Sequence, residues 1–248
     1  MKRWDARLIL LTAAAVTMAL VGGCARKIVD PTFTGLACGA ADQRESYMNP
    51  IDASRVQVIS VDSAFDDAQI AKIQSAIDSW NSQGRATLGH DLFRLQTLAI
   101  SANSVPTSVE DCGFPGVVGG FSVVKITAAQ TWTDLGFSRS NPGVTIRCSS
   151  GIEFAEKQVI LVNTSNMDAY PQIFENVILH ELGHAVGLGH SCDDQNKGKA
   201  GFRNCQSLEP TDDYFQAAMY PYIRADSPKE NLTANDQERA SCALNYRP

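Results

Sequence analysis

Three of the four histidines in this 248-residue chain lie within residues 180–190, which read HELGHAVGLGH. On a helix, His180 and His184 project from the same face because they are four residues apart. Gly187 then lets the backbone leave the helix, since glycine adopts a positive φ without a Cβ clash. The turn brings His190 back toward the other two rings. Three converging imidazoles predict a metal site with a fourth tetrahedral position left open. The alternative is a polar helix whose histidines bind nothing.

Glu181 directly follows the first histidine. This is the pattern in which two histidines bind zinc and the carboxylate acts as a general base. We therefore expect His180, His184 and His190 to bind one catalytic Zn²⁺, and Glu181 to carry the proton. The short pattern HExxH is weak evidence, because it also arises by chance on exposed helices. The added glycine and third histidine make the extended pattern specific.

The N-terminus predicts export. A basic start, interrupted by one aspartate, precedes the apolar residues 8–21, which are too few to span a bilayer comfortably and typical of a signal peptide. Residues 20–24 read LVGGC and resemble a bacterial lipobox. The resemblance implies cleavage before Cys24 and attachment of lipid to its sulfur. The alternatives are an ordinary secretory signal cleaved near the same glycines, or a retained membrane anchor.

These observations divide the chain into a lipoprotein signal peptide (1–23), a lipidated tether (24–54) and one domain (55–248). We expect a protein that is anchored by its lipid to the bacterial envelope, on the periplasmic or cell-surface side of the outer membrane. The formal net charge of the whole chain is −6, and loss of the basic signal peptide makes the mature chain more acidic. Such a balance argues against nucleic acid as a partner, because no basic patch is available to neutralise phosphates.

The cysteines agree with export. An even number remains after Cys24, and in an exported chain this predicts three disulfides whose connectivity the sequence leaves open. One pair lies in a single polar loop just after residue 190, and we expect it to be bridged. For the rest we favour Cys112–Cys148 and Cys38–Cys242. A second metal site is the weaker alternative, because no two of these cysteines are closely spaced. The loop pair is Cys192 and Cys205.

Hydrophobic periodicity predicts one α+β domain. Residues 55–61 alternate as a half-buried strand does, and a helix is expected from Asp66 or Asp67 through Ser82, ended by Gly84. A later helix carries the histidines from about Pro171 to Leu188. A terminal helix is expected over residues 234–246, with Thr233 as its N-cap. Further strands are expected over residues 93–100, 120–127, 144–148 and 158–162.

At this point the chain resembles the metzincins, and among them the matrixins. Residues 180–190 match the family motif in full, and Ser191 is the residue type that matrixins carry next. Residues 218–221 (AMYP) resemble the family's Met-turn, which implies that Met219 lies beneath the zinc. Residues 232–246 resemble the closing helix of the same family, and residues 55–81 fit a matrixin opening.

The resemblance implies a twisted, mostly parallel sheet of about five strands, three main helices and an active-site cleft at the zinc helix. It also implies a monomeric zinc endopeptidase that hydrolyses peptide bonds of extracytoplasmic proteins. In that chemistry zinc activates water, and Glu181 accepts the water proton and passes it to the leaving amine.

Three departures limit what the resemblance carries over. The segment between His190 and Met219 is longer than is usual and contains four aspartates, which either bind Ca²⁺ or are solvated loop charges. At the position where matrixins place an aromatic residue in the specificity pocket, this chain has Ile223, with Tyr222 one position earlier. His90 alone cannot build a second, structural zinc site. The four aspartates are Asp193, Asp194, Asp212 and Asp213.

Latency is open. Matrixin propeptides block the zinc with a cysteine in a Cys-Gly-x-Pro type segment. Cys38-Gly39 lies before the domain but lacks the proline, whereas residues 112–115 (CGFP) lie inside the domain. The even number of cysteines favours disulfides for both, and a cysteine switch at Cys38 is the alternative.

Two rival functions remain. The first is a zinc hydrolase that acts on cell-wall peptides or amides. The second is a non-catalytic surface-binding lipoprotein that keeps the metzincin-like fold but not the activity. The second predicts loss of Glu181 or of a histidine ligand, and the sequence retains all of them.

Overall fold

A computed structural model describes residues 51–100, 120–148, 157–167, 170–194 and 203–245. The predicted signal peptide, most of the predicted tether, Cys24, Cys38 and Cys112 lie outside the described residues. Among the helices of the described ranges, none combines the length and apolar character needed to cross a membrane.

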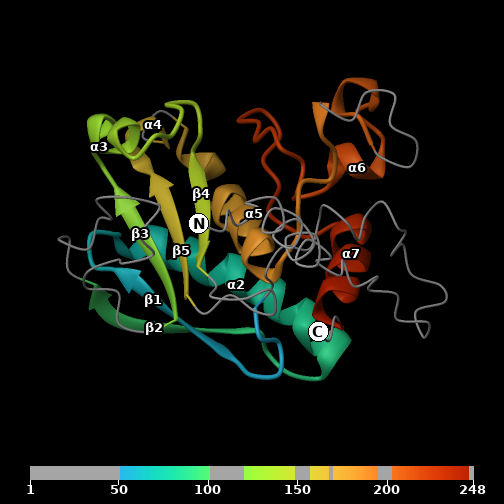
Figure 1. Cartoon of the computed structure of the whole chain (residues 1–248), viewed down its shortest axis with the longest axis horizontal. Helices are drawn as coiled ribbons and strands as arrows, with labels where there is room; N and C mark the ends of the chain where they lie inside the picture. The colour runs from blue at the N-terminus through green and yellow to red at the C-terminus, as the bar shows by residue number, and fades with distance from the viewer. Residues whose placement is uncertain (1–50, 101–119, 149–156, 168–169, 195–202, 246–248) are drawn as a thin grey trace, which may run out of the picture. The chain divides into compact units, whose positions relative to one another are not determined.

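A single five-stranded sheet forms the centre of the domain (Figure 1). The strand order is β2-β1-β3-β5-β4, with β1, β2, β3 and β5 parallel and β4 antiparallel at one edge. This confirms the predicted α+β class and the mostly parallel sheet of about five strands. The bounds are β1 Gln57–Asp62, β2 Phe93–Ile100, β3 Phe121–Ile126, β4 Gly143–Cys148 and β5 Lys157–Asn163.

Three main helices accompany the sheet, as predicted: α2 (Asp67–Leu88), α5 (Phe174–Val186) and α7 (Ala234–Leu244). A 3-10 turn, η2 (Pro171–Ile173), leads into α5, and Thr233 caps α7 with a full capping box. Periodicity did not predict the shorter elements, because a few residues are too few to show a helical repeat. They are α3 (Ala129–Asp134), α4 (Thr164–Met167), α6 (Asp213–Gln216) and the 3-10 turn η4 (Cys205–Ser207).

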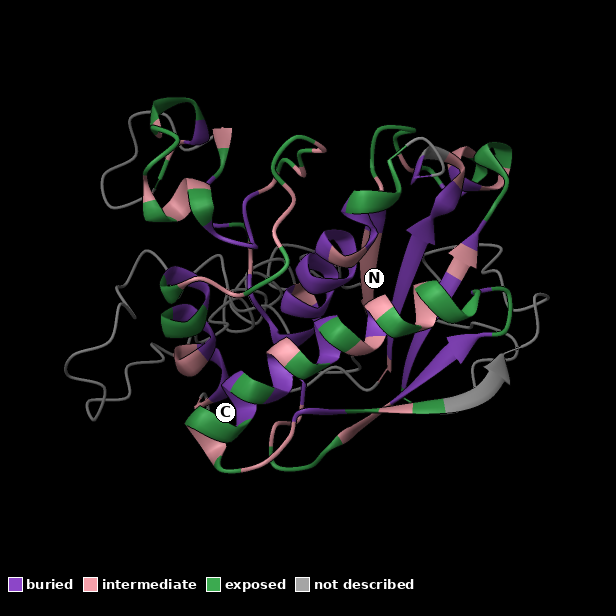
Figure 2. Cartoon of the chain, turned by 180° about the vertical axis from the view of Figure 1, so that it is seen from behind, coloured by how far each residue is buried: buried purple, intermediate pink, exposed green. Residues whose placement is uncertain are grey.

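The two faces of the sheet bury different cores, because alternate residues of a strand point to opposite sides. Val123, Ile160 and Val162 join the large core that α2, α5 and α7 complete. Val124 and Leu161 join a smaller cluster around the buried Trp132 of α3 on the other face. The inward side of α2 is buried and its outward side is exposed (Figure 2). The sheet is therefore covered on both faces, and α2 and α5 share one of them.

The predicted end of the first helix at Gly84 is wrong. Gly84 lies inside α2, and the helix continues to Leu88, where Gly89 ends it with a φ of 82°. A Cβ at Gly84 would lie 2.6 Å from Cγ of Leu92 and 2.8 Å from the carbonyl oxygen of His90. Gly84 therefore allows residues 90–92 to pack closely against α2, and it does not end the helix.

The packed domain begins before Arg55. Ile51 is 3% exposed and belongs to the main hydrophobic core. The end of the segment that the sequence assigned to the tether therefore lies within the fold.

Candidate metal centre

The three histidines of residues 180–190 converge. Their candidate ligand atoms all lie within 4.8 Å of one another. His180 and His184 come from one face of α5, which Gly187 ends with a φ of 106°, as the sequence predicted. The amide of Leu188 donates to the carbonyl of Gly183 at 2.9 Å, which closes the turn that returns His190. The local sequence thus folds into a three-nitrogen centre.

Two backbone carbonyls fix the ring orientation of His180 and His184. Nδ1 of His180 lies 2.8 Å from the carbonyl oxygen of Ala218, and Nδ1 of His184 lies 2.8 Å from that of Leu188. A carbonyl can only accept, so each Nδ1 carries the hydrogen and each neutral ring keeps its lone pair on Nε2. A hydrogen bond from the nitrogen that does not bind the metal commonly orients metal-binding histidines in this way. Both Nε2 atoms are therefore ready to bind a cation.

The rings are also held neutral. Burial lowers the pKa of His180 to about 3, with the nearby ring of His190 contributing in the same direction. Burial likewise lowers the pKa of His184. Because only the neutral imidazole binds metal, the lowered pKa values keep both ligands competent at neutral pH. His180 is buried, His184 is half-buried and His190 is exposed, so the centre opens outward at His190.

Glu181 directly follows His180 on α5 and is 4% exposed. Burial raises the pKa of its carboxyl to about 7, against a hydrogen bond from Thr145 and the positive charge of Arg147. The hydroxyl of Thr145 lies 2.7 Å from Oε2 of Glu181. A carboxyl with a pKa near neutrality can accept a proton and release it again, as a general base must. A divalent cation at the histidines would lower this pKa.

A tight turn containing Met219 packs against the metal-binding helix. The amide of Tyr220 donates to the carbonyl of Ala217 at 3.1 Å, which closes the turn. Met219 is fully buried, and its sulfur lies so close to Gly183 that a Cβ there would be 2.2 Å away. The same turn supplies the Ala218 carbonyl that orients His180. Met219 therefore packs against the helix that carries His180 and His184.

We expect Gly183→Ala to destabilise the protein. Alanine normally favours a helix interior over glycine by about 1 kcal/mol, but here the new methyl group would collide with Met219 and lie 3.1 Å from Trp80. Overpacking should outweigh the propensity gain and lower the unfolding free energy by about 1–3 kcal/mol, as measured by urea denaturation. The double variant Gly183→Ala/Met219→Ala should lose less than the sum of the two single variants, because the smaller side chain makes room. Additive losses would contradict the contact.

The terminal helix α7 holds both the turn and the third histidine. The buried carboxylate of Asp236 accepts from the amides of Ala218 at 2.7 Å and Met219 at 3.1 Å. Arg239, which is 1% exposed, donates through Nη2 to the carbonyls of Gly189 at 3.0 Å and His190 at 3.1 Å. The sequence did not predict either role, because both contacts join segments far apart in the chain.

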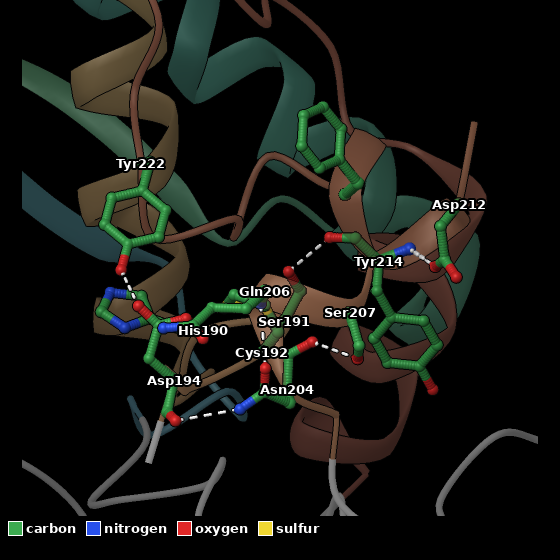
Figure 3. The surroundings of a disulfide bond; sticks show 12 residues. His190, Ser191, Cys192, Asp194, Asn204, Gln206, Ser207, Asp212, Tyr214 and Tyr222 are labelled. Carbon is green, nitrogen blue, oxygen red and sulfur yellow. Dashed lines mark hydrogen bonds between the residues drawn. A yellow bond between two sulfur atoms is a disulfide. The ribbon is translucent and has the colours of Figure 1, made fainter. Parts of the chain in front are cut away.

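The loop that follows His190 is bridged as predicted, by Cys192–Cys205. The amide of Ser191 donates to the carbonyl of Met219, and its hydroxyl donates to the carbonyl of Tyr214 at 2.5 Å. The hydroxyl of Tyr222 bonds the carboxylate of Asp194 (Figure 3). The disulfide closes the loop on itself, the Ser191 amide joins the start of the loop to Met219, and the Tyr222 bond joins the loop to the residues after the turn.

The remaining predicted residues are placed as follows. Cys148 and Cys242 are each disulfide-bonded, whereas their expected partners Cys112 and Cys38 lie outside the described residues. His90 is half-buried and its ring contacts the carbonyl of Asp91. Tyr222 is 51% exposed, and Ile223 packs against the main core.

The aspartates of the loop do not gather into a cation site within the described ranges, where the three histidines are the one cluster of metal-binding side chains. Asp212 instead caps α6 by accepting from the amide of Tyr214 at 2.8 Å.

Comparisons with known proteins add little. Neither the models of protein families nor the curated proteins contain a match to this chain. Among solved structures, one titled "Structure of myroilysin" aligns with 85% of this chain and 100% of its own length, at 12% identity and a TM-score of 0.39. This likeness is too weak to carry an argument. The fold and the site by themselves define an α+β protein with three histidines positioned to bind a metal ion.

Proposed function

We propose that this protein is a zinc-dependent endopeptidase of the metzincin type, with matrixin-like features, that cleaves extracytoplasmic proteins. One observation carries the proposal: three histidines converge, and the buried Glu181 directly follows the first of them on the same helix. Metal ligands together with an adjacent proton acceptor are the parts that hydrolysis by metal-activated water requires.

The residues fit a zinc ion. Zinc in catalytic sites prefers neutral imidazole nitrogen, and three protein ligands leave one position open. His180 and His184 present Nε2 while their Nδ1 atoms are held by backbone carbonyls, and His190 completes the set. Zinc bound there would supply Lewis-acid chemistry, acidifying water and polarising a carbonyl.

The chain's own residues supply the proton transfer. The carboxylate of Glu181 accepts the proton of the attacking water and then delivers it to the amine that leaves. Oε2 of this carboxylate accepts a hydrogen bond from the hydroxyl of Thr145. Burial of Glu181 limits the access of bulk water to its carboxyl.

The edge strand β4 provides a means of binding an extended peptide. It is the terminal strand in the sheet order and pairs only with β5 among the described strands. An extended substrate can add to such an edge by main-chain hydrogen bonds. Because β4 also lies beside α5 (Figure 1), a peptide bound there would pass near the histidines.

Cellular location belongs to the same proposal. Residues 20–24 support lipidation at Cys24 and attachment to the bacterial envelope, with residues 24–54 as the tether. The substrate would then be a protein or peptide in that compartment. We further propose that the protein acts as a monomer and does not bind nucleic acid.

A competition digest tests the substrate class. The chain from Ala25 onward, loaded with Zn²⁺, is incubated with casein and peptidoglycan peptides together, and the products are identified by mass spectrometry. We expect internal cleavage of casein. Release of cell-wall peptides alone would support the rival hydrolase, and failure to cleave either substrate would favour a surface-binding protein.

A further inference from the structure

The strand β4 contacts the metal-binding helix through one face. Gly143, Thr145 and Arg147 share that face, since alternate residues of a strand point the same way. Each of them meets α5. Gly143 approaches Val177 and Glu181, Thr145 bonds Glu181, and Arg147 donates to the carbonyl of His184 at 3.0 Å. The helix that carries the metal ligands is therefore held against an edge strand over two of its turns.

Gly143 allows the close approach. A Cβ at this position would lie 2.8 Å from Cγ1 of Val177 and 2.9 Å from Oε1 of Glu181. Real Cβ atoms do not come so close to other atoms, so any side chain here would push the strand away from the helix. The glycine thus brings the next residue on the same face, Thr145, within hydrogen-bond reach of Glu181.

Thr145 contacts Glu181 twice. Its Oγ1 lies 2.7 Å from Oε2 of the carboxylate and 2.9 Å from the backbone carbonyl oxygen of the same residue. The hydroxyl has one hydrogen, and a bond to an ionised acceptor is the stronger of the two. The Thr145 side chain therefore lies between the carboxylate of Glu181 and the backbone of the helix that carries it.

We propose that Thr145 is a positioning residue that holds the Glu181 carboxylate for proton transfer, with Gly143 setting the distance. The inference rests on the proposed function, because it gives Glu181 the role of base. It extends that function to a residue that no motif marks. A carboxylate free to rotate would spend only part of its time in the reactive geometry, and misplacement of about 1 Å can cost on the order of 100-fold in rate.

The test compares Thr145→Val with Thr145→Ser in the zinc-loaded chain. Valine keeps the branched shape and loses the hydroxyl, whereas serine keeps the hydroxyl. We expect kcat of Thr145→Val to fall roughly 10- to 100-fold with little change in KM, and Thr145→Ser to recover most of the loss. Thr133→Val is the matched control, since among the described residues the Thr133 hydroxyl bonds only carbonyls of its own short helix. It should retain the wild-type kcat.

Metal affinity provides a readout apart from activity. Titration of the metal-free chain with Co²⁺ should give the same dissociation constant for Thr145→Val as for the wild type, because the histidines are oriented by other groups. A weakened Co²⁺ affinity in Thr145→Val would show that the residue supports the ligands instead, and would overturn the inference.

Further kinetic results decide the matter. Wild-type kcat in Thr145→Val, or equal losses in the valine and serine variants, would overturn the inference. If Thr145→Val does not fold, Thr145→Ala replaces it, and equal kcat for the alanine and serine variants would overturn the inference. Glu181→Gln is measured in parallel: if it is inactive while Thr145→Val is fully active, only this inference falls, whereas full activity of Glu181→Gln removes the proposed function itself.

Discussion

Glu181→Gln is expected to lower kcat/KM for peptide cleavage by about 10²–10⁴-fold, the range that general acid–base groups contribute. Glutamine is nearly the same size as glutamate but does not accept the proton of the attacking water. The rings of His180 and His184 are held by groups other than Glu181, namely the carbonyls of Ala218 and Leu188. The variant should therefore still bind one metal ion per chain, as measured by metal analysis alongside steady-state kinetics.

The matched control is Glu175→Gln, in the first turn of the same helix. Glu175 accepts a hydrogen bond from Ser75 at 2.5 Å, away from the histidines. This variant should keep nearly all activity. Full activity of Glu181→Gln would show that another group serves as the base, and equal losses in both variants would show that the substitutions act by perturbing the helix.

Asp236→Ala is expected to produce the largest loss of stability among the changes considered. The side chain is fully buried and accepts from four donors: the amides of Ala218, Met219 and Thr233, and the hydroxyl of Thr233. Each buried donor that loses its partner costs about 1–3 kcal/mol. We expect the unfolding free energy of the metal-free chain to fall by roughly 3 kcal/mol or more, as measured by urea denaturation.

Metal affinity should fall in the same variant, because Asp236 positions the turn whose Ala218 carbonyl orients His180. Asp78→Ala is the control, since Asp78 is exposed on α2 and bonds only Gln74 among the described residues. Its unfolding free energy should stay within about 0.5 kcal/mol of the wild type. A similarly small change for Asp236→Ala would contradict the role given to this carboxylate.

The features that could be predicted from the sequence are those encoded locally. The four-residue spacing of His180 and His184 and the glycine at 187 specify a helix, its end and the return of His190 within one short segment. The bridge between Cys192 and Cys205 closes a loop of one polar segment. Short apolar segments specify the strands, because burial of one face leaves a repeat of two and burial of both faces leaves a continuous apolar run, as in β5.

The features that could not be predicted depend on contacts between distant segments. Nothing near Thr145 in the sequence shows that β4 will lie against α5, 36 residues later. Arg239 meets the carbonyl of His190 across 49 residues. The position of Gly84 inside α2 has a related cause. Glycine often ends a helix, but at position 84 it is required because Leu92 packs too close for a Cβ. Helical periodicity does not reveal this contact.

The central claim is that His180, His184 and His190 bind a zinc ion on which peptide cleavage depends. The most direct measurement is cleavage of a peptide library by the chain from Ala25 onward, before chelation, after chelation and after return of Zn²⁺. We predict internal cleavage that is lost on chelation and restored by zinc at one equivalent per chain. Cleavage that persists after the metal has been removed would contradict the account.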